Sequence, residues 1–220
     1  MVEVKNALLQ SLQQLVLQSR CAMCQRLSFG LICLDCRHQL ETCQLAIPLT
    51  FVDKLPLLAW GHYQGPLKQL LGRLKYDQQA QVARLLGQLL GVTWLETQSH
   101  LRESIVIPIP LHKVRQRERG YNQSALIANS FCQFTGLNSM LNGLVRVRAT
   151  AAQFSLSPQD RLTNVAEAFR IGPELAQKSR GSKIMLLDDI YTTGATINSA
   201  VETLSQAGFQ VVEIVVVAKA

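Results

Sequence analysis

The chain has 220 residues, of which 48% are hydrophobic and 17% charged, a composition typical of one globular core domain with room for a smaller unit. No apolar run reaches the roughly 18 residues that a membrane-spanning helix needs, and the N-terminus lacks a secretory pattern, so we expect a cytoplasmic protein. The formal net charge of +7 favours anionic partners such as nucleotides, nucleic acid or acidic membrane surfaces, without selecting among them.

An amphipathic helix is predicted at the start of the chain, over residues 5–19. Its apolar stripe includes Leu8, Leu12, Leu15 and Val16, with glutamines on the opposite side. We expect this stripe to pack on the body of the protein. A helix lying on a membrane surface is the less favoured alternative, because the polar side carries few cations.

Five of the six cysteines fall between positions 21 and 43, and four of them form two C-x-x-C pairs separated by eight residues. These are Cys21, Cys24, Cys33 and Cys36. Each pair can present two sulfurs to one metal ion, so the spacing predicts a tetrahedral zinc site in a zinc-ribbon unit. Four thiolates leave no open coordination position, which makes such a zinc ion structural and not catalytic.

Other uses of these cysteines are less favoured. A disulfide framework does not suit a reducing cytoplasm, and a redox pair needs one C-x-x-C beside a βαβ pattern, which both pairs here precede. His38 and Cys43 lie close by and could replace a ligand, although their spacing is poorer. Cys132 lies among phenylalanines and is predicted to be a small core residue.

Residues 49–103 are predicted to bridge the N-terminal unit (1–48) and a core (104–220). An extended stretch runs through Tyr63, a break follows at Gly65-Pro66, and two helical stripes come next. The stripes consist of Leu67, Leu70, Leu71 and Leu74, and then of Val82, Leu85, Leu86, Leu89 and Leu90.

The core alternates strands and helices. Strands are predicted over residues 105–110 and 141–147, from Lys183 onward, and over residues 210–217. Helices are predicted over residues 122–134 and from about Ile197 to Gly208. A long loop with a short helix is predicted over residues 148–169. This alternation indicates an α/β fold with a doubly wound, mostly parallel sheet. The last strand is nearly all aliphatic, so we expect it to be central or covered on both faces. Ligands of such sheets bind at the C-terminal strand ends.

The segment from Ile184 to Thr196 concentrates the chemistry of the chain. A buried strand over 184–187 ends at two adjacent carboxylates, Asp188 and Asp189, and a small-residue turn leads into a helix. The turn consists of Thr192, Thr193, Gly194, Ala195 and Thr196. Backbone N–H groups, hydroxyls and a helix N-terminus suit a phosphate, whereas the carboxylates suit hydroxyls or a metal ion. An ordinary strand–turn–helix with solvated acids is the alternative.

A cationic segment follows the first core strand. Lys113, Arg115, Arg117 and Arg119 place four cations within seven residues. At a strand's C-terminal end, such a segment could hold a strongly anionic ligand group. The alternative is a solvated basic helix start.

The sequence IMLLDDIYTTGAT resembles the 5-phosphoribosyl-1-pyrophosphate (PRPP) signature of type I phosphoribosyltransferases, and all thirteen positions fit. The resemblance implies that the loop of residues 192–196 binds the ribose 5-phosphate. It also implies that Asp188 and Asp189, the candidate catalytic residues, bind the ribose 2′- and 3′-hydroxyls. Arg115 and Arg119 would then face the pyrophosphate, with Mg²⁺ accompanying PRPP.

Further segments resemble the ComF family of phosphoribosyltransferase-like proteins, which is associated with bacterial competence for DNA uptake. These segments are IPIPLH, RERGYNQS, the R-x-R-x-T-x-x-Q pattern from Arg146, the stretch from Tyr63 to Tyr76, and the C-x-x-C pairs. The resemblance covers nearly the whole chain. Many relatives carry a further cysteine pair after the second C-x-x-C, whereas here Cys43 stands alone.

Together these features predict a PRPP-binding protein with structural zinc that acts in DNA uptake and transfers phosphoribose to an unidentified acceptor. The alternative is a non-catalytic, PRPP-regulated module for single-stranded DNA that works with the DNA-uptake machinery. Arg20, Arg26 and Arg37 of the ribbon could contact DNA, although a solvated basic rim is favoured. Residues 148–164 are a candidate lid. Candidate base-contacting residues are Trp60, His62, Tyr63, Lys75 and Tyr76, each of a type more often used in packing.

Overall fold

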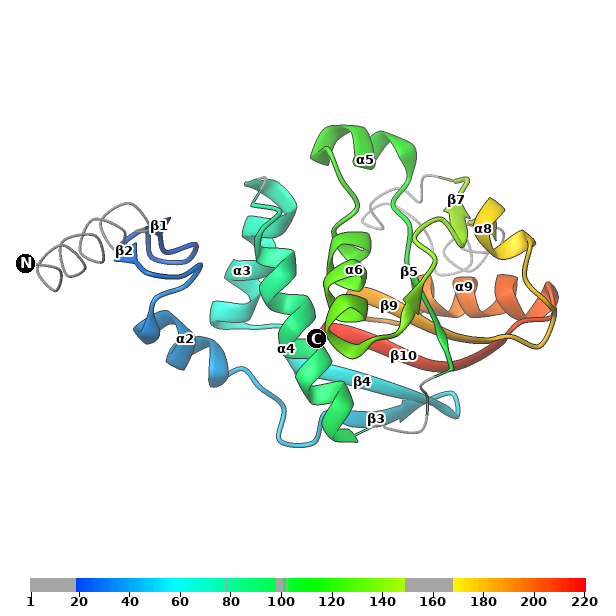
Figure 1. Ribbon diagram of the computed structural model, residues 1–220, viewed down its shortest axis with the longest axis horizontal. Helices are drawn as coiled ribbons and strands as arrows, with labels where there is room; N and C mark the ends of the chain where they lie inside the picture. Colours follow the sequence, from blue (N-terminus) through cyan, green and yellow to red (C-terminus); the bar gives the residue numbers. More distant parts are fainter. Residues whose placement is uncertain (1–18, 78, 98–100, 102, 149–167) are drawn as a thin grey trace, which may run out of the picture.

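A computed structural model describes residues 19–77, 79–97, 101, 103–148 and 168–220. Among the described residues, six strands form the central sheet in the order β3-β4-β10-β9-β5-β6 (Figure 1). Their bounds are β3 Leu49–Val52, β4 Leu55–His62, β5 Ile105–Pro108, β6 Asn138–Ser139, β9 Lys183–Tyr191 and β10 Gln210–Lys219. Only the β3–β4 pair of this sheet is antiparallel. The predicted α/β fold with a mostly parallel sheet is therefore confirmed.

Helices cover both faces of the sheet, as the doubly wound prediction requires. One face packs against α3 (Gly65–Tyr76), α4 (Val82–Thr97) and α6 (Gln123–Thr135), and the other against α8 (Pro173–Ala176) and α9 (Ala195–Gln206). Alternate residues of β9 serve the two layers: Met185 and Leu187 join the first core, whereas Ile184 and Leu186 join the second. Strand β10, between β4 and β9, is central as predicted.

Part of the region predicted to bridge the two units lies inside the sheet. Strand β4 pairs in parallel with β10, with Leu57 opposite Ile214. Its run from Leu57 to Trp60 is buried on both faces, which is the pattern of an interior parallel strand. The sheet thus draws on both residues 49–103 and residues 104–220, and the division of the chain at 48 and 103 stays a prediction.

The prediction of a core strand over 141–147 is wrong in place and extent. The edge of the central sheet is β6, and the chain then turns, with Gly143 N–H donating to the carbonyl of Met140 at 3.1 Å. This turn directs the next residues away from the sheet. They form β7 (Leu144–Arg146), which pairs antiparallel with β8 (Phe169–Ile171) in a separate two-stranded sheet.

The remaining described elements are β1 (Ser19–Arg20), β2 (Leu27–Ser28), α2 (Leu34–Glu41) and α5 (Lys113–Arg119). The predicted helix over 5–19 lies almost wholly outside the described residues, and so does the candidate lid apart from Arg148. Within the described ranges, no helix combines the length and apolar character that a membrane crossing requires.

Candidate functional site

Three segments of different origin meet at one edge of the sheet. Because β4, β5, β9 and β10 are parallel, their C-terminal ends share this edge. Helix α3 follows β4, the cationic helix α5 follows β5, and the small-residue turn follows β9. The structure therefore brings helix α3, the cationic helix α5, and the acid pair with the small-residue turn that follows it to the same side of the sheet.

The acid pair lies near the C-terminal end of β9, which continues beyond the predicted strand to Tyr191. The Oδ1 atom of Asp188 accepts hydrogen bonds from the hydroxyl of Ser124 on α6 (2.8 Å) and from the backbone N–H of Asp189 (2.9 Å). The side chain of Asp189 is 7% exposed, and its Oδ2 lies 2.7 Å from the Nζ of Lys75 on α3. The two atoms form a close ion pair, but their geometry does not meet that of a hydrogen bond.

The pKa of Asp188 is raised to about 7, first by burial and then by the negative charge of Asp189. The hydrogen bonds from Ser124 and from the Asp189 N–H, and the charge of Lys75, oppose this rise. Two adjacent carboxyl groups in a poorly hydrated place repel each other when both are ionised. Near neutral pH, Asp188 therefore exchanges between a carboxylate, which accepts hydrogen bonds, and a carboxylic acid, which can donate one.

The turn after the acid pair is built around a glycine. Gly194 has φ 79° and forms the N-cap of α9, which begins at Ala195, two residues earlier than predicted. A Cβ at this position would collide with the hydroxyl of Tyr191, so only glycine fits. Thr192 and Thr193 are exposed. Gly194 has no side chain to cap the helix, so the first N–H groups of α9 are suited to an anion.

The cationic segment forms the short helix α5, which stands above β5 and α6 in Figure 1. Its cations differ in their surroundings. Arg119 donates from Nη1 to Oε1 of Gln123 (3.0 Å), and its guanidinium lies 5.4 Å from the ring centre of Tyr76. Lys113, Arg115 and Arg117 are exposed.

Arg146 links the cationic helix to the acid pair electrostatically. Its guanidinium, on β7, lies 5.5 Å from the ring centre of Phe169. Burial lowers the pKa of Arg146, the charge of Arg115 lowers it further, and the charge of Asp188 raises it. Sequence reasoning noted this arginine within a family pattern but did not assign it to the site.

The segment after α5 forms hydrogen bonds with several surrounding elements. The hydroxyl of Tyr121 donates to the carbonyl of Leu74 on α3 (2.5 Å). Asn122 caps α6 by accepting from the Ser124 N–H (3.1 Å), and its Nδ2 donates to the carbonyl of Ile109 after β5 (3.1 Å). The RGYNQS block thus positions α3, α6 and Ser124 around the acid pair.

Among the five candidate base-contacting residues, His62 is exposed at the C-terminal end of β4, and Lys75 and Tyr76 lie beside the acid pair and Arg119. Lys75 pairs with Asp189, and Tyr76 is exposed beside Arg119. Trp60 is buried in the core, and the ring of Tyr63 lies 5.7 Å from the Nζ of Lys68. The sequence did not predict the contact of Ser124 with Asp188 or the pairing of Lys75 with Asp189. A serine or a lysine near the end of a helix gives no sign of a partner that is distant in the sequence.

The four predicted cysteines come together in the N-terminal unit, drawn in blue in Figure 1. The Sγ atoms of Cys21, Cys24, Cys33 and Cys36 all lie within 4.8 Å of one another. The 3.7 Å between the sulfurs of Cys24 and Cys33 matches the roughly 3.8 Å edge of a tetrahedron with zinc–sulfur bonds of about 2.3 Å. It is too long for a disulfide. The arrangement therefore fits a tetrahedral zinc ion.

Local hydrogen bonds favour the thiolates of Cys21 and Cys24, whereas burial and the neighbouring sulfurs raise the pKa of Cys36. The sulfur of Cys21 accepts N–H groups from Met23 and Cys33, each at 3.4 Å. The Nε of Arg26 donates to Cys24 at 3.3 Å, and this contact lowers the pKa of Cys24 to about 6. Arg26 also pairs with Asp35 at 2.9 Å, and its side chain is 63% exposed.

The other cysteines and His38 lie outside the cluster. Cys43 is buried and donates to the carbonyl of Gln64 (3.6 Å), whereas His38 is exposed and lies 3.4 Å from Glu41. Cys132 is buried in the main core, as predicted. Burial raises its pKa to about 12.

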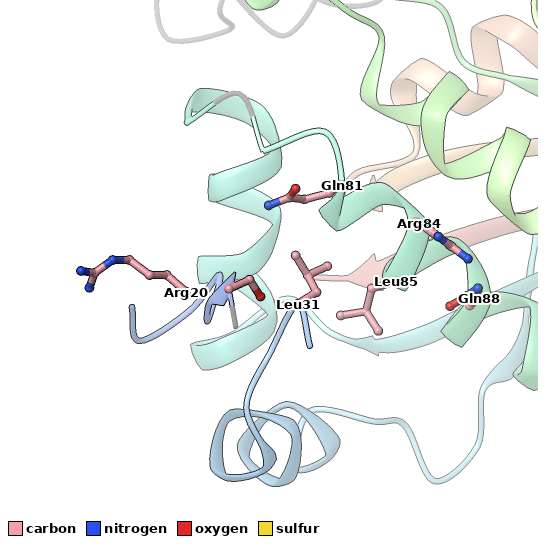
Figure 2. Close-up of a pocket in the computed structure, with 7 residues that line it drawn as sticks. Arg20, Leu31, Gln81, Arg84, Leu85 and Gln88 are labelled. Atoms are coloured by element: carbon pink, nitrogen blue, oxygen red, sulfur yellow. The ribbon is translucent and has the colours of Figure 1, made fainter. Parts of the chain in front are cut away.

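The cysteine unit packs directly on the main body. Cys21, Ala22 and Met23 are buried in the same cluster as the leucines of α3. A groove of about 410 Å³ lies between this unit and α4 (Figure 2). It is lined by Ser19, Arg20, Leu31, Gln81, Arg84, Leu85 and Gln88, with Leu31 and Leu85 in its middle. None of the residues predicted to bind PRPP or zinc lines it.

Comparison with known proteins identifies the family. Residues 135–220, which include the acid pair and the turn, match the model of the phosphoribosyl transferase domain. The chain is 32% identical to competence protein F of Haemophilus influenzae over 166 residues, which cover 74% of this chain and 71% of that protein. The chain belongs to the ComF family. The predicted type I phosphoribosyltransferase-like fold and the predicted family are confirmed.

Further relatives are similar over about two thirds or more of this chain. The DNA utilization protein YhgH of Salmonella typhimurium is 32% identical over 72% of this chain and 69% of its own length. Competence protein ComFC of Bacillus subtilis is 27% identical, over 66% of this chain and 56% of its own length. The relatives are thus named as competence and DNA utilization proteins, and this chain carries a phosphoribosyl transferase domain.

Proposed function

We propose that this ComF protein binds PRPP at the sheet edge, transfers its phosphoribosyl group to an acceptor, and acts in DNA uptake. The observation that carries the proposal is the succession of the acid pair, the Gly194 turn and the N-terminus of α9 on one strand-to-helix connection. A ligand bearing both a phosphate and vicinal hydroxyls satisfies these neighbouring groups together. The names of the relatives support the role in DNA uptake.

In this proposal, residues 192–196 hold the 5-phosphate with N–H groups and hydroxyls, and the two aspartates accept hydrogen bonds from the ribose hydroxyls. Arg115 and Arg119 face the pyrophosphate, and Arg146, which interacts electrostatically with both Arg115 and Asp188, adds a third cation. Magnesium would enter with PRPP and neutralise the leaving pyrophosphate. The chain's own residues position the donor and stabilise the departing charge.

Calorimetric titration of PRPP tests the binding step. The Asp188→Asn/Asp189→Asn double variant should lose most of its PRPP affinity with an unchanged circular dichroism spectrum. Asp53→Asn, which alters a carboxylate of the β3–β4 turn, is the matched control and should bind like the wild type. Unchanged affinity in the double variant would remove the ribose assignment. Release of pyrophosphate from PRPP in a screen of nucleobases and other metabolites tests the transfer step.

A second candidate function is PRPP-regulated binding of single-stranded DNA without catalysis. The exposed cations Lys113, Arg115 and Arg117 of α5 favour it. Binding of labelled single-stranded DNA across a salt series, with and without PRPP, separates the two candidates. Steep salt dependence that PRPP does not alter would indicate a separate DNA-binding face.

A further inference from the structure

The last turn of α3 lies between the cysteine cluster and the acid pair and touches both. On one side, Nη2 of Arg73 donates to the backbone carbonyl of Met23, inside the first C-x-x-C loop, at 3.4 Å. On the other side, Nζ of Lys75 lies 2.7 Å from Oδ2 of Asp189. Two residues of one helical turn thus connect the metal-binding loop to the candidate PRPP site.

This turn is also held from a third direction. Its Leu74 carbonyl accepts the Tyr121 hydroxyl at 2.5 Å, and the ring of Tyr76 lies against the guanidinium of Arg119. Arg73 further pairs with Asp77 at 3.2 Å. A helix end held by several partners allows its side chains a smaller range of positions than a free helix end does.

The position of Lys75 matters because of what surrounds the two carboxylates. The groups that face them are Lys75 from α3, Ser124 from α6 and Arg146 from β7, with Arg115 of α5 acting on Arg146. The side chains of Lys75 and Asp189 are only 16% and 7% exposed, so their attraction is weakly screened by water. Lys75 thus offsets the repulsion between the adjacent carboxylates, and its charge favours the ionised, hydrogen-bond-accepting state of Asp188.

We propose that Lys75 is a positioning residue for the ligand of the acid pair, and that metal at the cysteine cluster keeps Lys75 in place through the Arg73–Met23 contact. The identity of that ligand as PRPP rests on the proposed function; the connection itself rests on the contacts of α3. Loss of zinc should therefore weaken PRPP binding at a distance. By linkage, bound PRPP should raise the affinity of the cysteine cluster for zinc by the same factor.

Two measurements on the full chain test this proposal. The first detects the Lys75 ammonium group by ¹H–¹⁵N NMR, since a poorly hydrated, ion-paired ammonium exchanges slowly. We expect its signal in zinc-bound protein, assigned through Lys75→Arg, and its loss both on zinc removal and in zinc-bound Arg73→Ala. Asp77→Asn, which removes the ion-pair partner of Arg73 but not its contact with Met23, should leave the signal in place. A signal that survives zinc removal unchanged would overturn the proposal.

The second measurement is a double-mutant cycle on PRPP affinity. Zinc removal and Lys75→Met should each weaken binding about fivefold or more, and zinc removal in Lys75→Met should add less than about twofold. Lys75→Arg should recover part of the loss, and Lys68→Met, an exposed lysine of the same helix, should bind normally. Equal effects of zinc removal in both backgrounds would overturn the proposal. If zinc-bound wild type fails to bind PRPP, the proposed function falls, and the ammonium signal still decides whether metal holds Lys75.

Discussion

The indole Nε1 of Trp94 on α4 donates a 2.9 Å hydrogen bond to Oε2 of Glu213 on β10, and both side chains are fully buried. The ring of Trp94 packs edge-on against Phe131, 5.9 Å between centres. A carboxyl group thus lies within the apolar layer between the sheet and its helices. Burial raises the pKa of Glu213 to about 7, and the hydrogen bond from Trp94 only partly opposes this.

Glu213 should make the folded state more stable in mild acid. Its pKa is raised on folding, so its contribution to stability is complete below pH 4.5 and is lost as the pH rises through about 7. Above that pH the buried charge costs on the order of 3 kcal/mol. Glu213→Gln keeps an acceptor for Trp94 and should stabilise the protein at pH 8 but not at pH 5, measured by urea unfolding. Glu202→Gln, on the surface of α9, should change neither value.

Protonation of Asp188 should control PRPP binding near neutral pH. Because its pKa is raised to about 7, the carboxylate that would accept a ribose hydroxyl is lost as the pH falls below 7. Calorimetric affinity for PRPP should therefore fall between pH 8 and pH 6. Asp188→Asn should bind more weakly at pH 8 and show a flatter profile. If PRPP affinity changes equally with pH in the variant and in the wild type, the pH dependence belongs to another group.

Gly194 should not tolerate alanine. The substitution meets a backbone φ of 79° and the hydroxyl of Tyr191, so we expect a loss of about 1–3 kcal/mol in unfolding free energy. PRPP affinity should fall as well, because the turn cannot keep its shape. Gly72→Ala, in α3 where a Cβ meets open space, is the control and should be neutral or slightly stabilising. Equal melting temperatures for both variants would contradict this account of the turn.

Zinc should bind once per chain and depend on the clustered cysteines. Elemental analysis of Cys33→Ser purified without chelator should show no stoichiometric zinc, whereas Cys43→Ser, outside the cluster, should keep it. The N-terminal unit should lose stability while the sheet stays folded, because the sheet has its own apolar layers. Wild-type protein free of zinc, or unfolding of the whole chain in Cys33→Ser, would contradict these expectations.

The cations of α5 should distinguish PRPP from simpler phosphates. Arg115→Ala and Arg119→Ala should each weaken PRPP binding by about 1.5–3 kcal/mol while affinity for ribose 5-phosphate changes little. Arg117→Ala is the control variant, because Arg117 is an exposed arginine of the same helix to which no pyrophosphate contact is assigned. If instead all three lower DNA affinity and flatten its salt dependence while PRPP binding survives, α5 is a DNA-binding element.

Local pattern was sufficient to predict the parts of the site that lie close in sequence. One strand–turn–helix connection fixes the spacing of the acid pair and the Gly194 turn. One metal ion fixes the spacing of the four cysteines. The place of β4 beside β10 was not predictable, because strand order depends on partners about 150 residues apart. Lys75 was hard to assign for the same reason: a lysine near a helix end is usually solvated, and its carboxylate partner follows it by more than a hundred residues.

The strand order also constrains how the polypeptide is made. Strands β4 and β9 lie on opposite sides of β10 and cannot join one sheet until residues 210–219 have left the ribosome. Until then the nascent chain carries two aliphatic strands with open edges, a state prone to aggregation. Synthesis of this protein should therefore depend on chaperones that shield β4 while translation proceeds, and folding should be governed by closure of a loop of about 150 residues.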